Sequence, residues 1–249
     1  MVTEYKKPSL TKTHGFCAGC GHGLFVRLLH EVLDELDYSQ RFICVDGVGC
    51  SSNYFDALTL GSAIESHHGK APTIARGVKL ARPDLCVFTY QGDGDAYVIG
   101  LSETLNAAHF APPITTFILN NNNYGMTGGQ MSWTSLPYQK TTTSPAGRDP
   151  DTMGQPLDPL KLASQLDNVA FAARGALNSP GNIRTAKSYI RKALSYQLNE
   201  NRYSIVEFLS PCPTDWNMTP LQAIDWIDKE VTKYYPLGIL KDISEGGCC

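Results

Sequence analysis

The chain has 249 residues, of which 42% are hydrophobic, and a formal net charge of −3 at pH 7. This length can bury the core of one large α/β domain, and the charge gives no case for binding nucleic acid or an anionic membrane surface. No apolar run reaches the length of a membrane span, and the first residues lack the apolar core of a secretory signal. We therefore expect a single cytoplasmic domain spanning residues 1–249.

In chain order, the first third contains helical and strand patterns in turn. Residues 1–22 are polar and irregular, and residues 23–36 are predicted as an amphipathic helix because apolar side chains recur at helical spacing. A short strand is predicted at residues 41–45, followed by DGVGCSS, a loop of small residues. Residues 73–80 have a helical pattern that stops before Pro83.

The middle of the chain predicts a β–α–β unit. Leu85–Tyr90 and Ile114–Leu119 are apolar runs rich in β-branched and aromatic residues, as buried strands are. Between them Tyr97–His109 is compatible with a helix, which Pro112 and Pro113 end. The two strands of such a unit are parallel, so both carboxyl ends lie on one edge of the sheet, where ligands of open α/β sheets bind.

The last third adds two strands, a helix and two irregular segments. Residues 130–159 form a long polar segment, typical of a lid, an interface or a mobile loop. Val169–Arg174 and Tyr203–Leu209 are predicted strands on either side of a helix at Ile183–Leu198. The tail at residues 221–242 is expected to pack on a partner or on the domain. The whole pattern indicates the α/β class, with a mostly parallel sheet flanked by helices.

Two polar motifs follow the two strands of the β–α–β unit, GDGD after the first and NNNN after the second. Asp93 offers a carboxylate oxygen, Asn121 an amide oxygen and the following loop a backbone carbonyl, and Mg²⁺ prefers such ligands together with phosphate oxygens. Gly92 and Gly94 let the backbone approach a diphosphate closely, and the start of the next helix favours an anion. Either half alone would be a surface turn or a polar loop, but both at this spacing indicate a site for metal and diphosphate.

Eight cysteines are many for a cytoplasmic protein, and metal or cluster binding explains them better than disulfides. Cys17 and Cys20 form a Cys-x-x-Cys pair, while Cys50 and Cys212 each follow a predicted strand. On a parallel sheet the four thiolates could converge and hold a [4Fe–4S] cluster, although a structural zinc or no shared site also fits the spacing. A thioredoxin-like dithiol lacks the strand expected before it. The remaining cysteines are not expected to be ligands, because they lie in strands or on the polar tail: Cys44, Cys86, Cys248 and Cys249.

Together these motifs resemble a known family. FCAGCGHG, GVGCSS, HHGKA, GDGD, NNNNYGMTGGQ and SPCPT occur in the order found in the β subunit of 2-oxoacid:ferredoxin oxidoreductases, over residues 17–214. The segments QKTTTSPAGRDP and YYPLG look most like the branched-chain, 2-oxoisovalerate type. The resemblance implies the thiamine diphosphate-binding fold, with thiamine diphosphate, Mg²⁺ and a [4Fe–4S] cluster as cofactors.

The resemblance also implies roles for matching positions. The Mg²⁺ ligands would be the side chains of Asp93 and Asn121 and the backbone carbonyl of Asn123. The matching [4Fe–4S] ligands are Cys17, Cys20, Cys50 and Cys212. The positions that match contacts to thiamine diphosphate are Val48, Gly49, Cys50, Ser51, His68, Gly92, Gly94, Asp95, Gly125 and Met126. His68 is also the candidate catalytic residue, whereas His67 is expected to be structural. Lys70 replaces the arginine usual in the HGRA segment and loses its bidentate geometry toward phosphate.

The implied activity is the oxidative decarboxylation of a 2-oxoacid to acyl-CoA and carbon dioxide, with single electrons passing through the cluster to ferredoxin. We expect 2-oxoisovalerate as the first-choice substrate, then 2-oxoglutarate or pyruvate, in an oxygen-sensitive enzyme of anaerobic metabolism. In the resembled family the activating glutamate comes from the α subunit, and here Glu65 and Glu103 are only the nearest carboxylates in sequence. The chain is therefore expected to be inactive alone, with α, γ and ferredoxin-like δ subunits or domains as partners.

Two other functions stay open on the sequence. A non-redox thiamine diphosphate decarboxylase or synthase would share GDGD and the asparagines, but it has no use for four aligned cysteines. A zinc-stabilised, non-catalytic scaffold subunit would bind neither thiamine diphosphate nor iron. Iron and sulfide analysis separates both from the redox enzyme.

Overall fold

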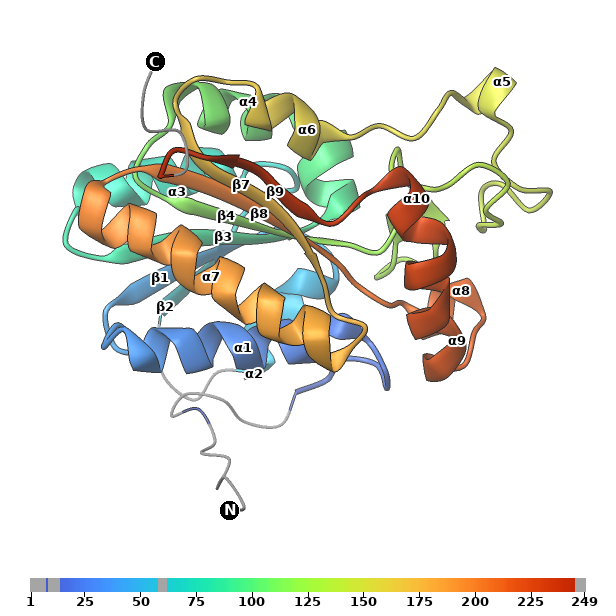
Figure 1. Cartoon of the computed structure of the whole chain (residues 1–249), viewed down its shortest axis with the longest axis horizontal. Helices are drawn as coiled ribbons and strands as arrows, with labels where there is room; N and C mark the ends of the chain where they lie inside the picture. Colours follow the sequence, from blue (N-terminus) through green and yellow to red (C-terminus); the bar gives the residue numbers. More distant parts are fainter. Residues whose placement is uncertain (1–7, 9–13, 58–61, 245–249) are drawn as a thin grey trace.

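A computed structural model describes residues 8, 14–57 and 62–244. Within this part of the chain, seven strands form one sheet in the order β2–β1–β3–β4–β8–β7–β9 (Figure 1). All neighbouring pairs are parallel except β7 with β9, which confirms the expected α/β class with a mostly parallel sheet. The strands are β1 (Phe42–Asp46), β2 (Ser62–Glu65), β3 (Cys86–Gly92), β4 (Thr115–Asn120), β7 (Val169–Ala176), β8 (Tyr203–Leu209) and β9 (Gly238–Asp242). A separate antiparallel hairpin pairs β5 (Asn123–Tyr124) with β6 (Gln130–Met131).

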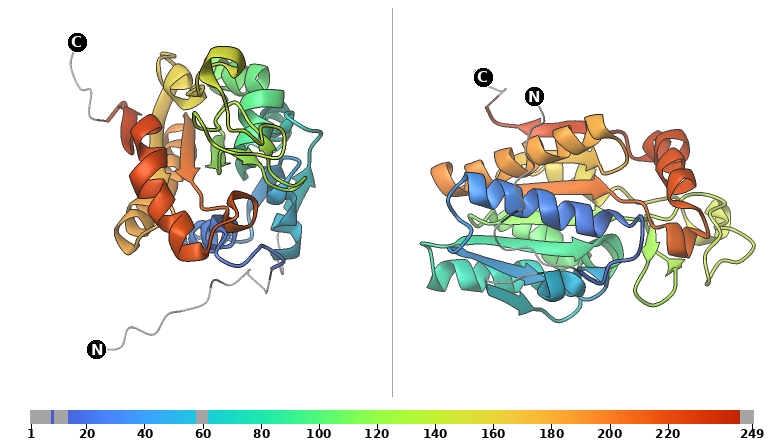
Figure 2. Two further views of the ribbon diagram at one scale, coloured as in Figure 1. Left: turned by 90° about the vertical axis from the view of Figure 1, so that its right-hand side faces the viewer. Right: turned by 90° about the horizontal axis from the view of Figure 1, so that it is seen from below.

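Helices cover both faces of the sheet, as Figures 1 and 2 show. Phe117 and Ile118 are neighbours on β4 and enter different cores, because successive strand residues point to opposite faces. One core lies under α1 and α7 and the other under α3, α4 and α6. The bounds of these helices are α1 (Gly21–Glu35), α3 (Ala71–Ala81), α4 (Leu101–Phe110), α6 (Pro159–Ser164) and α7 (Pro180–Glu200). No helix in the described residues is long and apolar enough to cross a membrane.

Shorter helices complete the fold, several of them at the edge formed by the carboxyl ends of the parallel strands. They are the 3₁₀-helix η1 (Cys50–Asn53), α2 (Tyr54–Ala57), the π-helix η2 (Gly94–Ile99), α5 (Pro150–Met153), α8 (Pro213–Trp216), α9 (Pro220–Trp226), the π-helix η3 (Ile227–Val231) and α10 (Thr232–Tyr234). In Figure 1 this edge faces right, and α8, α9 and α10 lie beside it.

The predicted helix at residues 97–109 is in fact two helices, η2 and α4, joined at Gly100. The Gly100 N–H donates to the carbonyl of Asp95 over 2.8 Å, which is the wider turn of a π-helix. A side chain at Gly100 would bring its Cβ within 2.5 Å of the Gly69 carbonyl oxygen. The break therefore lets the loop of residues 67–70 approach the start of α4.

The C-terminal tail packs on the domain. Strand β9 pairs antiparallel with β7 at the sheet edge, and the side chain of Asp242 accepts hydrogen bonds from Lys192 and Tyr196 of α7. The tail thus closes one edge of the sheet, which reduces exposed backbone N–H and C=O groups there.

The long segment at residues 132–158 projects beyond the carboxyl edge (Figure 1) and is held by one buried guanidinium. Arg148 is 2% exposed and donates to backbone carbonyls at both ends of the segment. These carbonyls belong to Trp133, Ser135, Met153, Gly154 and Gln155. The segment is therefore a built part of the fold around a polar centre, and its role as a lid, an interface or a mobile loop stays a prediction.

Candidate functional site

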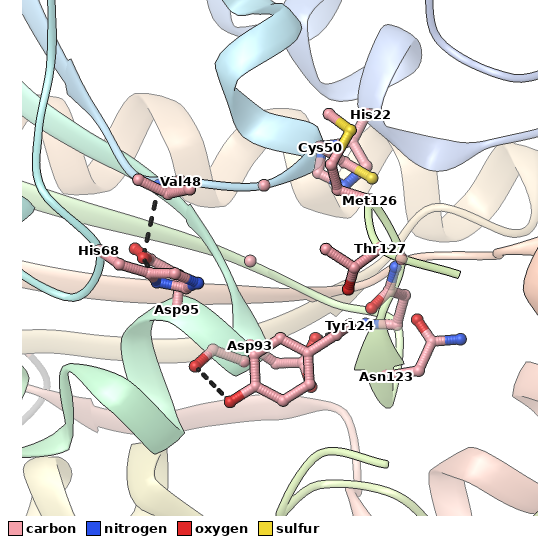
Figure 3. Close-up of a pocket in the computed structure, with 15 residues that line it drawn as sticks. His22, Val48, Cys50, His68, Asp93, Asp95, Asn123, Tyr124, Met126 and Thr127 are labelled. Atoms are coloured by element: carbon pink, nitrogen blue, oxygen red, sulfur yellow. Dashed lines mark hydrogen bonds and ion pairs between the residues drawn. The ribbon is translucent and has the colours of Figure 1, made fainter. Parts of the chain in front are cut away.

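The carboxyl ends of β1, β3, β4 and β8 bring most of the predicted site residues to one place, shown end-on in Figure 2. A cavity of about 140 Å³ opens there. Its lining residues are His22, Val48, Gly49, Cys50, His68, Gly92, Asp93, Gly94, Asp95, Asn121, Asn123, Tyr124, Gly125, Met126 and Thr127 (Figure 3). Twelve of these fifteen are sequence-predicted site residues, and the other three are His22, Tyr124 and Thr127. Small-molecule pockets typically measure roughly 300–1,000 Å³, so this cavity suits one end of a cofactor.

Oxygen atoms converge at the ends of β3 and β4. The Asn121 amide oxygen lies 2.9 Å from Asp93 Oδ1, 2.9 Å from the backbone oxygen of Asn123 and 3.2 Å from the Asn123 side-chain oxygen. Oxygen ligands of an octahedral Mg²⁺, each about 2.0–2.1 Å from the ion, lie about 2.9 Å apart. This amide orientation suits a bound cation, whereas in the chain by itself a half-turn places the Asn121 nitrogen there, where it donates to the three other oxygens. The donor set is thus of the kind that Mg²⁺ takes.

Asp93 is buried, and hydrogen-bond donors from the projecting segment stabilise its ionised carboxylate. Thr134 donates to Asp93 Oδ2, which leaves Oδ1 facing Asn121. Burial raises the pKa of Asp93 to about 6, against the lowering effect of hydrogen bonds from Thr134, Ser132 and the Asn121 N–H. Asp93 is therefore mostly ionised at pH 7 and ready to bind a cation.

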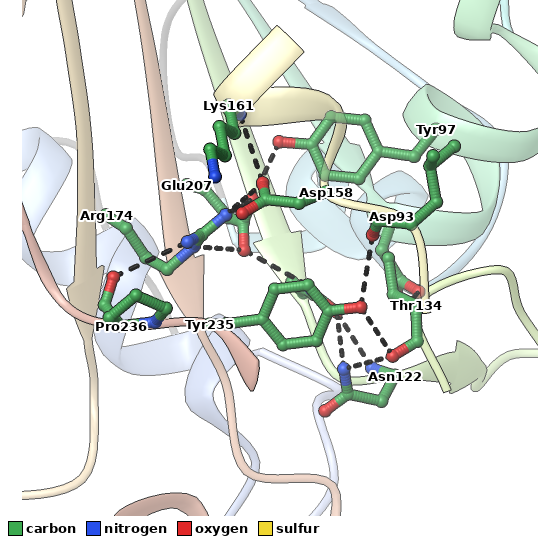
Figure 4. A network of polar contacts seen from close by, with 12 residues as sticks. Asp93, Tyr97, Asn122, Thr134, Asp158, Lys161, Arg174, Glu207, Tyr235 and Pro236 are labelled. Carbon is green, nitrogen blue, oxygen red and sulfur yellow. Dashed lines mark hydrogen bonds and ion pairs between the residues drawn. The ribbon is translucent and has the colours of Figure 1, made fainter. Parts of the chain in front are cut away.

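A buried polar network supports this ligand loop from behind (Figure 4). The Asn122 amide donates to the Thr134 carbonyl over 2.9 Å, and its backbone N–H donates to Asn120 Oδ1 over 3.0 Å. The Asn120 amide donates to Glu207, which also receives the Arg174 guanidinium at 3.0 Å. The turn after β4 is thus tied to β8, β7 and the projecting segment, which fixes where Asn121 and Asn123 point.

Asp95 connects three segments around the cavity. Its Oδ1 accepts hydrogen bonds from the His68 ring and from the backbone N–H groups of Gly69, at 2.8 Å, and Val48, at 3.4 Å. Its other oxygen accepts one from Gln91. The carboxylate is therefore satisfied within the chain, and it positions the residues 47–50 loop and the His68 ring relative to the cavity.

His68 points its ring into the cavity, with Nδ1 bound to Asp95. Because a carboxylate accepts, Nδ1 carries a hydrogen, and the second ring nitrogen, Nε2, is left for a bound group. The ring also meets Tyr124 edge-on, with centroids 6.4 Å apart. Its neighbour His67 is exposed and outside the cavity wall, and Ser51 is buried with its hydroxyl donating to the Gly47 carbonyl.

The four predicted cluster cysteines lie in three segments of the chain that come together beside the cavity, and of the four only Cys50 lines its wall. Cys17 and Cys20 lie in a turn before α1, closed by the Cys20 N–H donating to the Cys17 carbonyl over 3.1 Å. This turn packs on the end of β8, because the Gly21 N–H donates to the Pro211 carbonyl and a Cβ at Gly21 would lie 2.4 Å from Ser210 Oγ. The sequence segment that carries Cys212 is therefore adjacent.

The pKa values of the thiols are affected by burial and by the closeness of the cysteines to one another. Burial, together with the neighbouring charges of Cys20, Asp215 and Cys17, raises the pKa of Cys50 to about 12. Burial raises the pKa of Cys20 to about 11, despite the His22 backbone N–H that donates to its sulfur. Thiols with raised pKa values become thiolates only when a cation or cluster stabilises them. In the described residues no group of three or more His, Cys, Asp or Glu side chains is drawn together closely enough to hold a single metal ion.

We call the four cysteines the sulfur side of the cavity, and Asp93, Asn121 and Asn123 its oxygen side. The two sides adjoin at Gly125. A Cβ placed there would lie 3.2 Å from Cys50 Sγ, 3.2 Å from Asp215 Oδ2 and 3.2 Å from the Asn121 amide nitrogen. Asp215 also accepts a hydrogen bond from the Cys212 thiol over 3.2 Å. The Cys50 thiol and the Asn121 amide therefore lie close to each other, on two sides of Gly125. Cys44 and Cys86 are fully buried in strands, as expected of small apolar residues.

Lys70 and the two candidate glutamates lie outside the cavity. Lys70 forms an ion pair with Glu103, and both are at the start of helices on the outer side of the loop. Glu65 is exposed at the end of β2. The carboxylates that line the cavity, Asp93 and Asp95, are both hydrogen-bonded within the chain.

Sequence reasoning missed His22 because it placed the helix start at Gly23, whereas α1 begins at Gly21. His22 is therefore inside the first turn of α1, where its ring is fixed. Burial lowers the pKa of His22 to about 4, so the ring is neutral near pH 7. Tyr124 and Thr127 lie within the NNNNYGMTGGQ motif, and the tight β5–β6 hairpin that turns them to the cavity gave no separate signal.

Comparison with known proteins agrees with this geometry. Residues 47–208 match the family described as thiamine pyrophosphate enzyme, C-terminal TPP binding domain. The chain is 39% identical, over 94% of its length, to ketoisovalerate oxidoreductase subunit VorA of Methanothermobacter thermautotrophicus, and spans only 49% of that protein. It is 32% identical, over 84% of its length and 73% of the relative's, to 2-oxoglutarate synthase subunit KorB of Archaeoglobus fulgidus.

A solved structure is also similar over almost the whole chain. It is the 2-oxoglutarate:ferredoxin oxidoreductase of Magnetococcus marinus with 2-oxoglutarate, coenzyme A and succinyl-CoA bound. The TM-score is 0.76 at 25% identity, covering 97% of this chain and 86% of the other. The chain therefore belongs to the thiamine pyrophosphate enzyme family, through its TPP-binding domain, and within it to the 2-oxoacid oxidoreductase subunits that include VorA and KorB.

Proposed function

We propose that this chain is the thiamine diphosphate-binding subunit of a cytoplasmic 2-oxoacid:ferredoxin oxidoreductase, built as a single domain. One 2-oxoacid and one coenzyme A would give one acyl-CoA, one carbon dioxide and one proton, while two ferredoxins each take up one electron. When bound, thiamine diphosphate supplies the electron sink for the loss of carbon dioxide. The observation that carries the proposal is the convergence of oxygen donors and thiols on two sides of one cavity in a TPP-binding domain.

The oxygen side would bind Mg²⁺ and the diphosphate. Asp93 and Asn121 would supply side-chain oxygens and Asn123 its backbone oxygen, because these oxygens already lie at the separations of ligands around Mg²⁺. Thr134 would hold Asp93 in its charged form. His68 would face the cofactor with Nε2 free to accept or carry a proton, while Asp95 keeps its ring in place.

The sulfur side would bind a [4Fe–4S] cluster through Cys17, Cys20, Cys50 and Cys212. Four thiols with mutual electrostatic effects, three of them well buried or half-buried, fit a group that takes four thiolates and brings its own positive charge. Cys50 lines the cavity, so it would place the cluster beside the cofactor. A non-redox thiamine enzyme would have no use for this arrangement.

The site would be completed by a partner subunit. No carboxylate of the cavity wall is available to activate the aminopyrimidine of thiamine diphosphate, because Asp93 and Asp95 are both engaged and Glu65 and Glu103 lie outside. The cavity is also smaller than a whole cofactor needs. We infer an α-type subunit that supplies the activating glutamate, with γ-type and ferredoxin-like δ-type subunits or domains completing the path to ferredoxin.

Among substrates, we propose 2-oxoisovalerate first and 2-oxoglutarate or pyruvate second. The ketoisovalerate subunit shares 39% of aligned residues and the 2-oxoglutarate subunit 32%. Among the described residues, no Lys or Arg side chain lines the cavity to pair with the second carboxylate that 2-oxoglutarate carries.

The test is turnover of the assembled complex and of this chain alone, with coenzyme A and methyl viologen as the electron acceptor. We expect viologen reduction with 2-oxoisovalerate in the complex and none with the chain alone. Iron and sulfide analysis of the same complex should give about four of each per copy of this subunit beyond what the ferredoxin-like subunits or domains contain. Robust turnover by the isolated chain, or a complex that decarboxylates without iron, would overturn the proposal.

A further inference from the structure

His22 occupies the boundary between the thiols and the cavity (Figure 3). It lies two residues after Cys20, in the first turn of α1, and lines the cavity together with Cys50. Its side chain is almost fully enclosed, with Phe16 stacked on the ring at 5.5 Å between centroids and 19° between planes. The ring is therefore held in one orientation, and none of the roles assigned above uses it.

Tyr90 determines which ring nitrogen of His22 carries the hydrogen. The Tyr90 hydroxyl lies on β3, fully buried, and is hydrogen-bonded to His22 Nδ1. In the described part of the chain this hydroxyl has no other partner, so its proton goes to Nδ1, because buried hydroxyl protons are normally bonded. The hydrogen of the His22 ring then resides on Nε2.

The Nε2–H group has no acceptor among the described residues, although the ring lines the cavity. The backbone N–H of His22 donates to the Cys20 sulfur, and its ring lines the same cavity as Cys50. A ring N–H in the cavity wall without an acceptor in the described residues is available to donate to a bound group.

We propose that His22, oriented by Tyr90, is a positioning residue that donates its Nε2–H to a sulfur atom of the cluster and stabilises the reduced form. This inference rests on the proposed function. A hydrogen bond to a cluster sulfur stabilises the extra negative charge of the reduced state, so it raises the reduction potential. His22 would thus help to set how readily electrons leave the cofactor side of the cavity.

The chain contains a matched control on the same helix. His30 is also buried and its Nε2 is bonded to the Tyr54 hydroxyl over 2.9 Å. The His30–Tyr54 pair resembles the His22–Tyr90 pair in chemistry and burial, but it does not line the cavity. Substitutions at His30 therefore report the cost of losing a buried histidine without the proposed contact to the cluster.

The experiment uses the assembled complex and compares His22→Phe, His22→Gln and His30→Gln with the unsubstituted protein. An EPR-monitored redox titration gives the midpoint potential of the cluster in this subunit. We expect the ratio of reduced to oxidised cluster at a fixed potential to fall about tenfold in His22→Phe, a shift of about 59 mV to lower potential for a one-electron couple. In His22→Gln the introduced side-chain amide can donate from nearly the same place, so this variant should restore most of the shift, and His30→Gln should cause none.

A second readout does not depend on activity or on the Phe variant folding. Pulsed EPR of the reduced cluster in protein labelled with ¹⁵N in the histidine rings should show a nitrogen coupling that disappears in His22→Gln and persists in His30→Gln. No coupling in the unsubstituted complex, or equal potentials in His22→Phe and the unsubstituted complex, overturns the role of His22. A complex that contains no iron at all overturns the proposed function instead, so the two failures are distinguishable.

Discussion

The two sides of the cavity are built by different means. On the oxygen side, Asp93 and the turn after β4 are held by hydrogen bonds from Thr134 and from the network that reaches Glu207 and Arg174. On the sulfur side, burial and neighbouring negative charge raise the pKa values of Cys20, Cys50 and Cys212 and so oppose their ionisation. The chain thus holds its oxygen ligands in place before the cofactor binds, whereas its sulfur ligands depend on the bound group for their charged form.

The largest expected effect is loss of the cluster from the sulfur side alone. Replacing Cys17, Cys20 or Cys212 with Ser should remove the cluster of this subunit, about four iron atoms per copy, and leave the iron of the ferredoxin-like partner, because each variant removes one of four thiolates. Thiamine diphosphate affinity should stay within about twofold, because these residues lie outside the cavity wall. Iron analysis and calorimetry of the assembled complex measure the two properties. Cys44→Ser and Cys86→Ser are the controls, and loss of iron in these variants as well would contradict the assignment.

Next in size is removal of the central carboxylate on the oxygen side. Asp93→Ala should weaken thiamine diphosphate binding in the presence of Mg²⁺ by about 100-fold or more, since it deletes the one charged oxygen of the set. Iron content should be retained. This variant would thus lose cofactor affinity and keep iron, the reverse of the cysteine variants. Asp84→Ala is the control, because Asp84 is exposed at the other end of β3 and paired with Arg82. Unchanged cofactor affinity in Asp93→Ala would show that the oxygens do not bind the metal.

The pH dependence tests whether the oxygen ligands are already charged. Folding raises the pKa of Asp93 from 3.8 to about 6, and Mg²⁺ binds the ionised carboxylate, so protons compete with the metal below that value. Mg²⁺-dependent affinity for thiamine diphosphate should be constant above pH 7 and fall about tenfold per unit below pH 6. Titration calorimetry at several pH values measures this dependence, and Asp93→Asn shows what the diphosphate itself contributes. Parallel curves for the two proteins would assign the dependence to the cofactor.

A smaller effect is expected from loosening the support of Asp93. Thr134→Val removes the hydroxyl that donates to Asp93 Oδ2, and loss of such a supporting contact typically weakens metal binding by about tenfold. Thr134→Ser keeps the hydroxyl and should bind normally. Calorimetry with Mg²⁺ and thiamine diphosphate distinguishes the two variants. Equal losses in both would trace the effect to packing rather than to the hydrogen bond.

The smallest effect is predicted at Lys70, which lies near the oxygen side in sequence but outside the cavity. Lys70→Ala should change thiamine diphosphate affinity by less than about threefold, because its ammonium pairs with Glu103 on an exposed surface. Glu103→Gln should behave alike. A tenfold loss in Lys70→Ala alone, measured in the same assay, would place the ammonium on the phosphate and extend the oxygen side outward.

The sequence predicted the motifs that follow strands better than the elements between them. Asp93, Asn121 and Cys50 could be placed together because strand patterns and parallel pairing fix where strand ends lie. Strand β2 escaped prediction because it has four residues and little apolar character. The π-helix η2 was not predicted because GDAYVI and the following helix share one pattern of apolar residues. Only the close approach of Gly69 to Gly100 in the structure reveals the break.

Residues that act through long-range contacts were the hardest to predict. Thr134 is 41 positions from Asp93, and Tyr90 is 68 positions from His22, so no local pattern links either pair. The hydrogen bonds of Asp95 to its own chain were equally hard to predict, because the motif alone would assign this carboxylate to the cofactor. Chemistry at strand ends is visible in sequence, whereas the side chains that hold it in place become visible only when the fold brings them together.

The way Arg148 holds the projecting segment has a consequence for how the segment can vary. The guanidinium binds backbone carbonyls, which every residue type provides, so the course of the chain does not depend on the side chains at those positions. Trp133 and Met153 are among these positions, and both side chains are partly exposed at 44% and 41%. Substitutions on the outer surface of the projection can therefore adapt it to a different neighbouring protein. The backbone stays unchanged, and Thr134 continues to donate to Asp93.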